Sequence, residues 1–202
     1  MKHLSIVLLA AASLFSGCVN DPRLGSGTLY LADNGSVVCL PDRGRANFDN
    51  ISYWDGDSVG GAPSILIRLG EQTAYFYKGG HLVGVSSLST GREGYNTPTG
   101  NFTIIRKNKN HVSSCYGDYV DAKTGEILQR NIDRRQDPMP KGAKYDGAKM
   151  NFYMEIKPGY GMHEGFLPGV PASHGCIRMP SFMAEAFFHS APVGTPVRVV
   201  QQ

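Results

Sequence analysis

Residues Gly161 to Pro180 read G-M-H-E-G-F-L-P-G-V-P-A-S-H-G-C-I-R-M-P. This stretch holds two of the six histidines and one of the four cysteines of the chain, set among three prolines and four glycines. A nucleophile, candidate bases and a tightly turned backbone therefore fall together, and the sequence predicts that the chemistry of the protein is done here.

The reactive group of this stretch is predicted to be the thiol of Cys176. A cysteine attacks as a thiolate, which forms near neutral pH where a histidine or a helix N-terminus stabilises the anion. His174 lies two residues upstream and His163 thirteen. Pro180-Ser181 predicts a helix start, with serine as the cap and proline in the first turn. The amide hydrogens of Gly175 and Cys176 are expected to point at a developing oxyanion.

Two other interpretations of the same residues stay open. Cys176 could be a buried structural thiol, although its neighbours are small, polar and turn-forming, which favours a reactive one. Alternatively, His163, His174 and Cys176 could bind zinc. Structural zinc usually takes four ligands with cysteines in close pairs, and the chain contains neither C-x-x-C nor H-x-x-x-H. The residue pattern therefore favours catalysis without a metal.

Three segments together resemble a known family. They are Ser173-His174-Gly175-Cys176-Ile177-Arg178 with His163 upstream, Ser89-Thr90-Gly91, and Thr97-Pro98-Thr99-Gly100-Asn101-Phe102. In order and spacing they resemble the L,D-transpeptidase catalytic domain, a cysteine acyltransferase of bacterial peptidoglycan. The resemblance covers about residues 63 to 200. The gap between His163 and Cys176 is shorter than in the best-known members of that family.

The resemblance implies a role for each residue of the cysteine motif. Cys176 would be the nucleophile, and His163 would be the general base. His174, with the amides of Gly175 and Cys176, would stabilise the oxyanion. The residues that would orient the loop are Ser173 and Arg178.

The resemblance also implies partners and rival activities. Peptidoglycan stem peptides would be the donors, an amine or an envelope protein the acceptor, and no cofactor would be needed. With water as acceptor the same site would be an L,D-carboxypeptidase, and some family members instead cut wall-protein tethers. A non-catalytic peptidoglycan-binding lipoprotein is the alternative from another class. A cysteine peptidase of another fold is a weaker alternative. In such peptidases the cysteine commonly precedes its histidine in the chain, whereas here both histidines come first.

The 202-residue chain is 41% apolar and 18% charged, which indicates one globular domain of ordinary core size. We divide it into a signal peptide (1–17), a lipidated tether and N-terminal extension (18–62) and the catalytic domain (63–202). Its net charge of +3 is too small to indicate a nucleic-acid partner.

The first residues predict export and a lipid anchor. Lys2 precedes an apolar run from Leu4 to Phe15, which is too short to span a bilayer. Leu14-Phe15-Ser16-Gly17-Cys18 resembles a bacterial lipobox, in which Cys18 becomes the lipidated N-terminus, and an ordinary cleavage site nearby is the alternative. Val19 resembles the residue that directs such lipoproteins to the outer membrane. The expected location is therefore the cell envelope, facing the periplasm.

Two cysteines remain once Cys18 and Cys176 are assigned. Exported proteins occupy compartments where disulfides persist. Cys39 and Cys115 are therefore expected either to pair or to remain as two thiols.

Short apolar runs separated by glycine turns predict strands from residue 64 onward. Residues 149–156 alternate between apolar and polar side chains, which also predicts a strand. The remaining expected strands are 65–69, 73–77, 82–85, 102–105 and 197–200, with one helix over 181–189. The fold class is therefore mostly β, a sandwich or barrel with one or two short helices, as the family resemblance also implies.

Residues 108–148 are polar, with weak periodicity, and are expected to form a long irregular lid. His111 and Tyr116 in this segment are candidate substrate contacts or ordinary surface residues. No role is assigned to His81 or His189.

Overall fold

We describe residues 29–31, 37–39, 49 and 51–202 in a computed structural model. Strands β1 (Leu29–Leu31) and β2 (Val37–Cys39) pair antiparallel. The predicted signal peptide and Cys18 lie outside the described residues. Within the described part of the chain, no helix is both long and apolar enough to cross a bilayer.

A six-stranded sheet forms one layer of the body. The predicted hairpins are confirmed, since β5 pairs antiparallel with both β4 and β6. Gly79 and Gly80 join β5 to β6 with φ angles of 57° and 86°, which glycine adopts without steric cost. In spatial order the strands are β3 (Tyr53–Trp54), β6 (His81–Ser87), β5 (Thr73–Lys78), β4 (Pro63–Arg68), β13 (Pro196–Val200) and β7 (Gly100–Thr103).

A five-stranded sheet forms the second layer. Its strands, in spatial order, are β12 (Ile177–Met179), β11 (Tyr160–Glu164), β10 (Ala143–Lys157), β8 (Arg106–Asp121) and β9 (Ile127–Asp133). Only β11 and β12 pair in parallel; the other neighbours are antiparallel. A parallel pair needs a crossover connection. Residues 165–176 make that connection, and they carry most of the cysteine motif.

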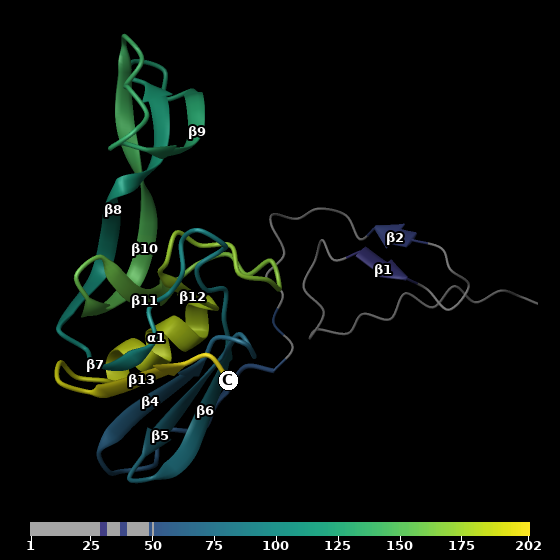
Figure 1. The fold of residues 1–202 in the computed structure, drawn as a ribbon, viewed down its shortest axis with the longest axis vertical. Coiled ribbons are helices and arrows are strands. Elements are labelled where there is room, and N and C mark those ends of the chain that lie inside the picture. Colours follow the sequence, from purple (N-terminus) through teal and green to yellow (C-terminus); the bar gives the residue numbers. More distant parts are fainter. Residues whose placement is uncertain (1–28, 32–36, 40–48, 50) are drawn as a thin grey trace, which may run out of the picture.

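Helix α1 (Ser181–Ser190) lies between the two sheets (Figure 1). Phe187 is fully buried there and packs edge-on against Phe76 of the six-stranded sheet, with ring centroids 4.8 Å apart. The predicted helix is confirmed, but its predicted cap is wrong. Pro180 occupies the N-cap and Ser181 is already helical, with no side-chain cap hydrogen bond. The chain therefore enters the helix directly from β12.

The segment expected to be irregular is instead a β-arm. Strands β8 and β10 run antiparallel from Arg106 and Glu155 out to Asp121 and Ala143, and β9 pairs with the outer half of β8. The arm stands out from the body (Figure 1). Much of its surface on both faces meets solvent, so its polar side chains do not alternate with apolar ones, and the two-residue period that reveals a half-buried strand is missing.

The predicted alternation along β10 is only partly realised. Met154 and Ile156 face the core, as the pattern predicts, but Tyr153 and Glu155 on the opposite face are also buried. The second face is covered because the ring of Tyr153 packs against the rings of His111 and His163. The alternation of the sequence is therefore not an alternation of burial at this end of β10.

Candidate active site

The parallel pairing of β11 and β12 brings the predicted site residues together. Met162 is the register partner of Ile177, and His163 that of Arg178. Cys176 immediately precedes Ile177, the first residue of β12. It therefore lies beside β11, the strand that carries His163. His163 thus lies on β11, and Cys176 lies at the start of the strand that pairs with it.

The two upstream motifs hold the crossover loop in place. Thr97 Oγ1 accepts the N–H of Gly91 at 2.9 Å and donates to the carbonyl of Gly175, also at 2.9 Å. The carbonyl of Thr90 accepts the N–H of Ser173 at 3.0 Å. Only glycine fits at position 91, because a Cβ there would lie 1.9 Å from the carbonyl oxygen of Tyr95. Both segments therefore support the cysteine motif by hydrogen bonds to its backbone.

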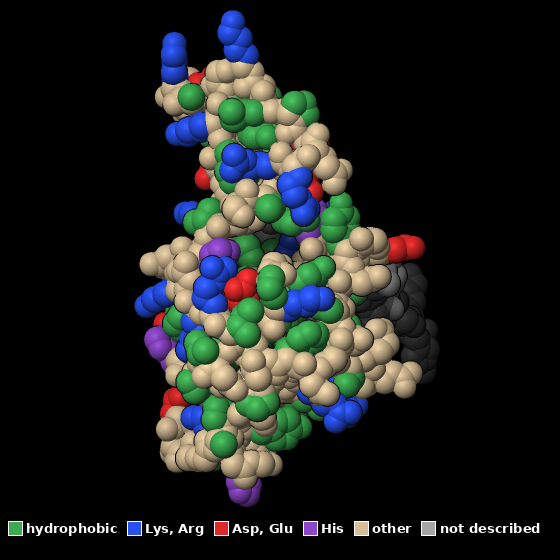
Figure 2. All heavy atoms as spheres, turned by 60° about the vertical axis from the view of Figure 1, so that its left-hand side comes forward, with side chains coloured by type: hydrophobic (Ala, Val, Ile, Leu, Met, Phe, Trp, Pro, Cys, Tyr) green, Lys and Arg blue, Asp and Glu red, His purple; other side chains and the backbone are tan. Residues whose placement is uncertain are grey.

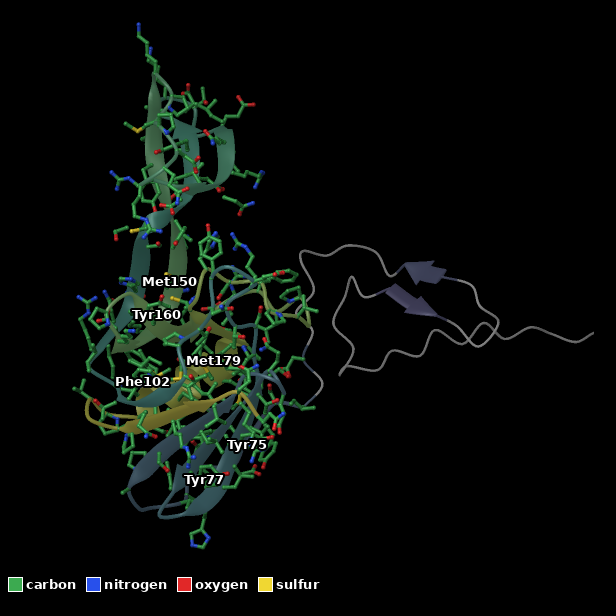
Figure 3. The ribbon with its side chains drawn as sticks, in the orientation of Figure 1. Tyr75, Tyr77, Phe102, Met150, Tyr160 and Met179 are labelled. Carbon is green, nitrogen blue, oxygen red and sulfur yellow. The ribbon has the colours of Figure 1, made fainter. Side chains whose placement is uncertain are left out.

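Ser173 closes the turn that presents the cysteine. Its hydroxyl donates to the carbonyl of Cys176 and accepts the N–H of Gly175 at 3.0 Å. Gly175 has a φ of 108°, and a Cβ there would meet the ring of Tyr160 at 2.8 Å; Figure 3 labels Tyr160 on β11 below the arm. In this turn the Gly175 amide is donated to Ser173, not directed to the substrate side as expected.

His163 is held in the tautomer of a proton acceptor. Its Nδ1 lies 2.6 Å from the carbonyl oxygen of Glu164. A carbonyl only accepts, so Nδ1 carries the hydrogen and Nε2 keeps its lone pair. Burial lowers the pKa of His163 to about 4, and the charge of Arg178 adds to this effect. The ring is therefore neutral at pH 7 and able to take a proton.

Cys176 rests as a neutral thiol. Its sulfur lies 3.7 Å from the carbonyl oxygen of Gly159, and no hydrogen bond joins it to His163 among the described residues. Burial raises the pKa of Cys176, opposed by the Gly161 N–H and the charge of Arg178. The thiolate expected from the sequence is thus not the resting form, because desolvation outweighs the groups that favour the anion.

Tyr153 is a site residue that the sequence pattern did not single out. Its side chain is 2% exposed, its ring centroid lies 6.3 Å from that of His163, and His111 stacks on its other side at 4.3 Å. Burial raises the pKa of Tyr153, and the nearby sulfur of Cys176 adds to the rise. The continuation of β10 into the His163 loop was the only available signal. His111, a candidate substrate contact, lies beside this tyrosine.

His174 lies in a different environment from His163. Its ring contacts Arg92 and Tyr95 of the loop between β6 and β7, and Tyr116 of the arm stacks on its face. Tyr116, the other candidate substrate contact, therefore packs against the loop that carries Cys176. On the face where the arm meets the body, Lys and Arg side chains gather around the junction (Figure 2).

Of the other cysteines, only Cys115 has its side chain in the described part of the structure. Cys115 is a free thiol on β8, and the side chain of Cys39 lies outside the described residues, so their pairing stays a prediction. His81 and His189 lie away from the motif, on β6 and at the end of α1. In the described part of the chain, no three His, Cys, Asp or Glu side chains are arranged to hold a metal ion.

Comparison with known proteins was made for sequence and for structure. Residues 62–199 match the family model of the L,D-transpeptidase catalytic domain. The fold is similar to an L,D-transpeptidase from Stackebrandtia nassauensis, with a TM-score of 0.50 and 18% identity over 72% of this chain and 60% of that one. It is also similar to an L,D-transpeptidase from Mycobacterium smegmatis, with a TM-score of 0.51 and 18% identity over 91% and 80%. No significant match was found among curated protein sequences.

Proposed function

Because this chain belongs to the L,D-transpeptidase catalytic-domain family, we propose that it is a peptidoglycan L,D-transpeptidase that works through a thioester on Cys176. The observation that best supports this chemistry is the hydrogen bond from His163 Nδ1 to the Glu164 carbonyl. It leaves Nε2 as a proton acceptor on the strand next to Cys176. A half-buried thiol and a neutral imidazole form the pair needed for base-assisted attack.

The first half-reaction forms the thioester. His163 Nε2 takes the thiol proton as the sulfur of Cys176 attacks the carbonyl carbon of the bond between an L-centre and a D-centre of the donor stem. The C–N bond breaks, and His163 returns the proton to the departing amine of D-alanine. We assign stabilisation of the oxyanion to His174 and the N–H of Cys176, because the N–H of Gly175 donates to the hydroxyl of Ser173.

The second half-reaction transfers the acyl group. An amine on a second stem attacks the thioester carbonyl, a C–N bond forms, and the C–S bond breaks. The proton lost by the amine passes through His163 back to the sulfur. With a side-chain amine of a stem as acceptor the product is a cross-link, and with a lysine of an envelope protein the product is an anchored protein.

The setting of this reaction rests on the sequence alone. We propose that the chain is exported and lipid-anchored at Cys18, in the outer membrane and facing the periplasm, where peptidoglycan lies. The mechanism uses only groups of the protein itself, so no cofactor is proposed.

The direct test is mass spectrometry of purified disaccharide-tetrapeptide after incubation with the protein. We expect a dimer whose mass equals two substrate molecules less one alanine. Cys115→Ala, which removes the other described free thiol, should form the same dimer, and Cys176→Ala should form none. A tripeptide as the only product would instead make the protein an L,D-carboxypeptidase. An unchanged substrate with the folded wild-type chain would refute the proposed activity.

A further inference from the structure

The ring of His174 is held by residues from two separate segments. The guanidinium Nη2 of Arg92 lies 2.8 Å from His174 Nε2. The ring of Tyr116 stacks on the imidazole with a centroid distance of 4.2 Å and an interplanar angle of 18°. Tyr95 meets the imidazole edge-on at 4.8 Å. Contacts on a face, an edge and a ring nitrogen leave the imidazole one orientation.

The contact with Arg92 also fixes the tautomer of His174. A guanidinium is always protonated and can only donate hydrogen bonds. His174 Nε2 must therefore accept, and the ring hydrogen is on Nδ1. No described residue accepts a hydrogen bond from this Nδ1–H, and no buried side-chain nitrogen of the described chain lacks a partner. The Nδ1–H is therefore an accessible donor two residues from Cys176.

The charges around His174 oppose its protonation. Burial lowers the pKa of His174 to about 4, and the positive charges of Arg92, Arg178 and Arg135 act in the same direction. Asp133 is the one carboxylate acting against them. These groups come from the β6–β7 loop, from β12, from the residues after β9 and from β9 itself. The ring therefore stays a neutral donor throughout the neutral pH range.

Tyr116 makes the arm part of this arrangement. It lies on β8, and its hydroxyl accepts Arg135 Nη2 at 2.6 Å. Arg135 is fixed in turn by Asp133, whose carboxylate oxygens lie 2.9 and 2.7 Å from Nε and Nη2. Asp133 closes β9. A continuous set of contacts thus runs from the outer sheet of the arm to the loop that carries the cysteine.

We propose that Arg92 and Tyr116 are positioning residues that hold His174 as an Nδ1–H donor for an oxygen atom of the bound stem peptide. Seating of the arm on the body is then a condition of catalysis, because the arm supplies the ring that fixes the plane of the imidazole. The inference deepens the proposed transpeptidase function and rests on it. Donors that are already oriented stabilise a developing charge without reorganisation.

The tautomer can be measured without any activity. In the full chain labelled with ¹⁵N-histidine, and with His174→Gln for assignment, the Nδ1-protonated neutral ring should persist at pH 5.5. Arg92→Leu should produce the Nε2-protonated form and raise the titration midpoint by about one pH unit. Arg92→Lys, which keeps a charged donor, should retain the wild-type tautomer. An Nε2-protonated ring in the wild type, or an unchanged tautomer in Arg92→Leu, would overturn the proposal.

The contribution of the arm is measured by single-turnover acylation. Tyr116→Leu should lower the acylation rate about tenfold with KM changed less than about twofold, since orientation and not substrate affinity is lost. Tyr116→Phe keeps the stacked ring and should stay within about twofold of the wild type. The matched control is Tyr77→Leu on β5, far from the arm (Figure 3). An unchanged rate in folded Tyr116→Leu contradicts the role of the arm.

The two measurements separate this proposal from the proposed function. If the wild type forms no thioester, the transpeptidase assignment fails, and the ¹⁵N spectra alone decide whether Arg92 sets the tautomer. If the wild type is active but Tyr116→Leu and Arg92→Leu leave both rate and tautomer unchanged, the positioning role is wrong and the transpeptidase assignment stands.

Discussion

Acid should destabilise the folded protein through His163. Its side chain is 6% exposed, and burial lowers its pKa from 6.5 to about 4. Between these values the unfolded chain binds a proton at this residue and the folded chain does not. The stabilisation is therefore complete above pH 6.5 and is lost as the pH falls toward 4. For these two pKa values, linkage gives a loss of about 2 kcal/mol between pH 7.5 and pH 5.

The measurement is urea unfolding of the wild type and of His163→Gln at both pH values. The glutamine amide can still donate to the Glu164 carbonyl, but it does not titrate. The difference in pH response between the two proteins should therefore be about 2 kcal/mol, a midpoint shift on the order of 1 M urea. All other titrating groups are shared and cancel. His189→Gln makes the same substitution at an exposed ring and is the matched control for the substitution itself. Equal losses in the wild type and His163→Gln would refute the argument from burial.

Three further substitutions test the packing around the site, each by thermal and urea unfolding. Gly91→Ala places a Cβ 1.9 Å from the Tyr95 carbonyl oxygen. It should lower the free energy of unfolding by about 1–3 kcal/mol and abolish acylation; wild-type stability would contradict the geometry. Lys107→Met removes the ammonium that donates to two carbonyls at the end of α1 and should cost about 1–2 kcal/mol, whereas no change would mean that water replaces it. Phe187→Ala empties a fully buried position and should cost about 3–5 kcal/mol; a loss below about 1 kcal/mol would show that the site collapses.

The sequence predicts those parts of the fold in which one local pattern decides the structure. The hairpins of the six-stranded sheet follow from apolar runs broken by glycine pairs such as Gly79-Gly80, and they form as expected. The place of the cysteine motif in the fold is the crossover between β11 and β12, and its catalytic role stays a prediction. The helix predicted over 181–189 is also confirmed, as Ser181–Ser190, although its predicted cap is wrong.

Prediction from the sequence fails where the surroundings of both faces of a strand determine which side chains are buried. The arm was missed because solvent meets both its faces, so no periodicity marks β8 and β9. Tyr153 was missed for the opposite reason, since both faces of the inner end of β10 are covered. Tyr116 could not be placed at all, because its contact with His174 joins residues that are 58 positions apart. Only the three-dimensional packing relates them.

In the proposed mechanism the site starts with two neutral groups, and this determines how attack on the substrate must begin. Burial raises the pKa of the Cys176 thiol and lowers that of His163 to about 4, so both shifts oppose transfer of the thiol proton to the imidazole. A standing ion pair is therefore negligible. Proton transfer becomes favourable only when the negative charge can move onward from sulfur to a carbonyl oxygen. The donors around that oxygen then control the reactivity of the thiol, so the orientation of His174 should limit the acylation rate more than the intrinsic acidity of Cys176 does.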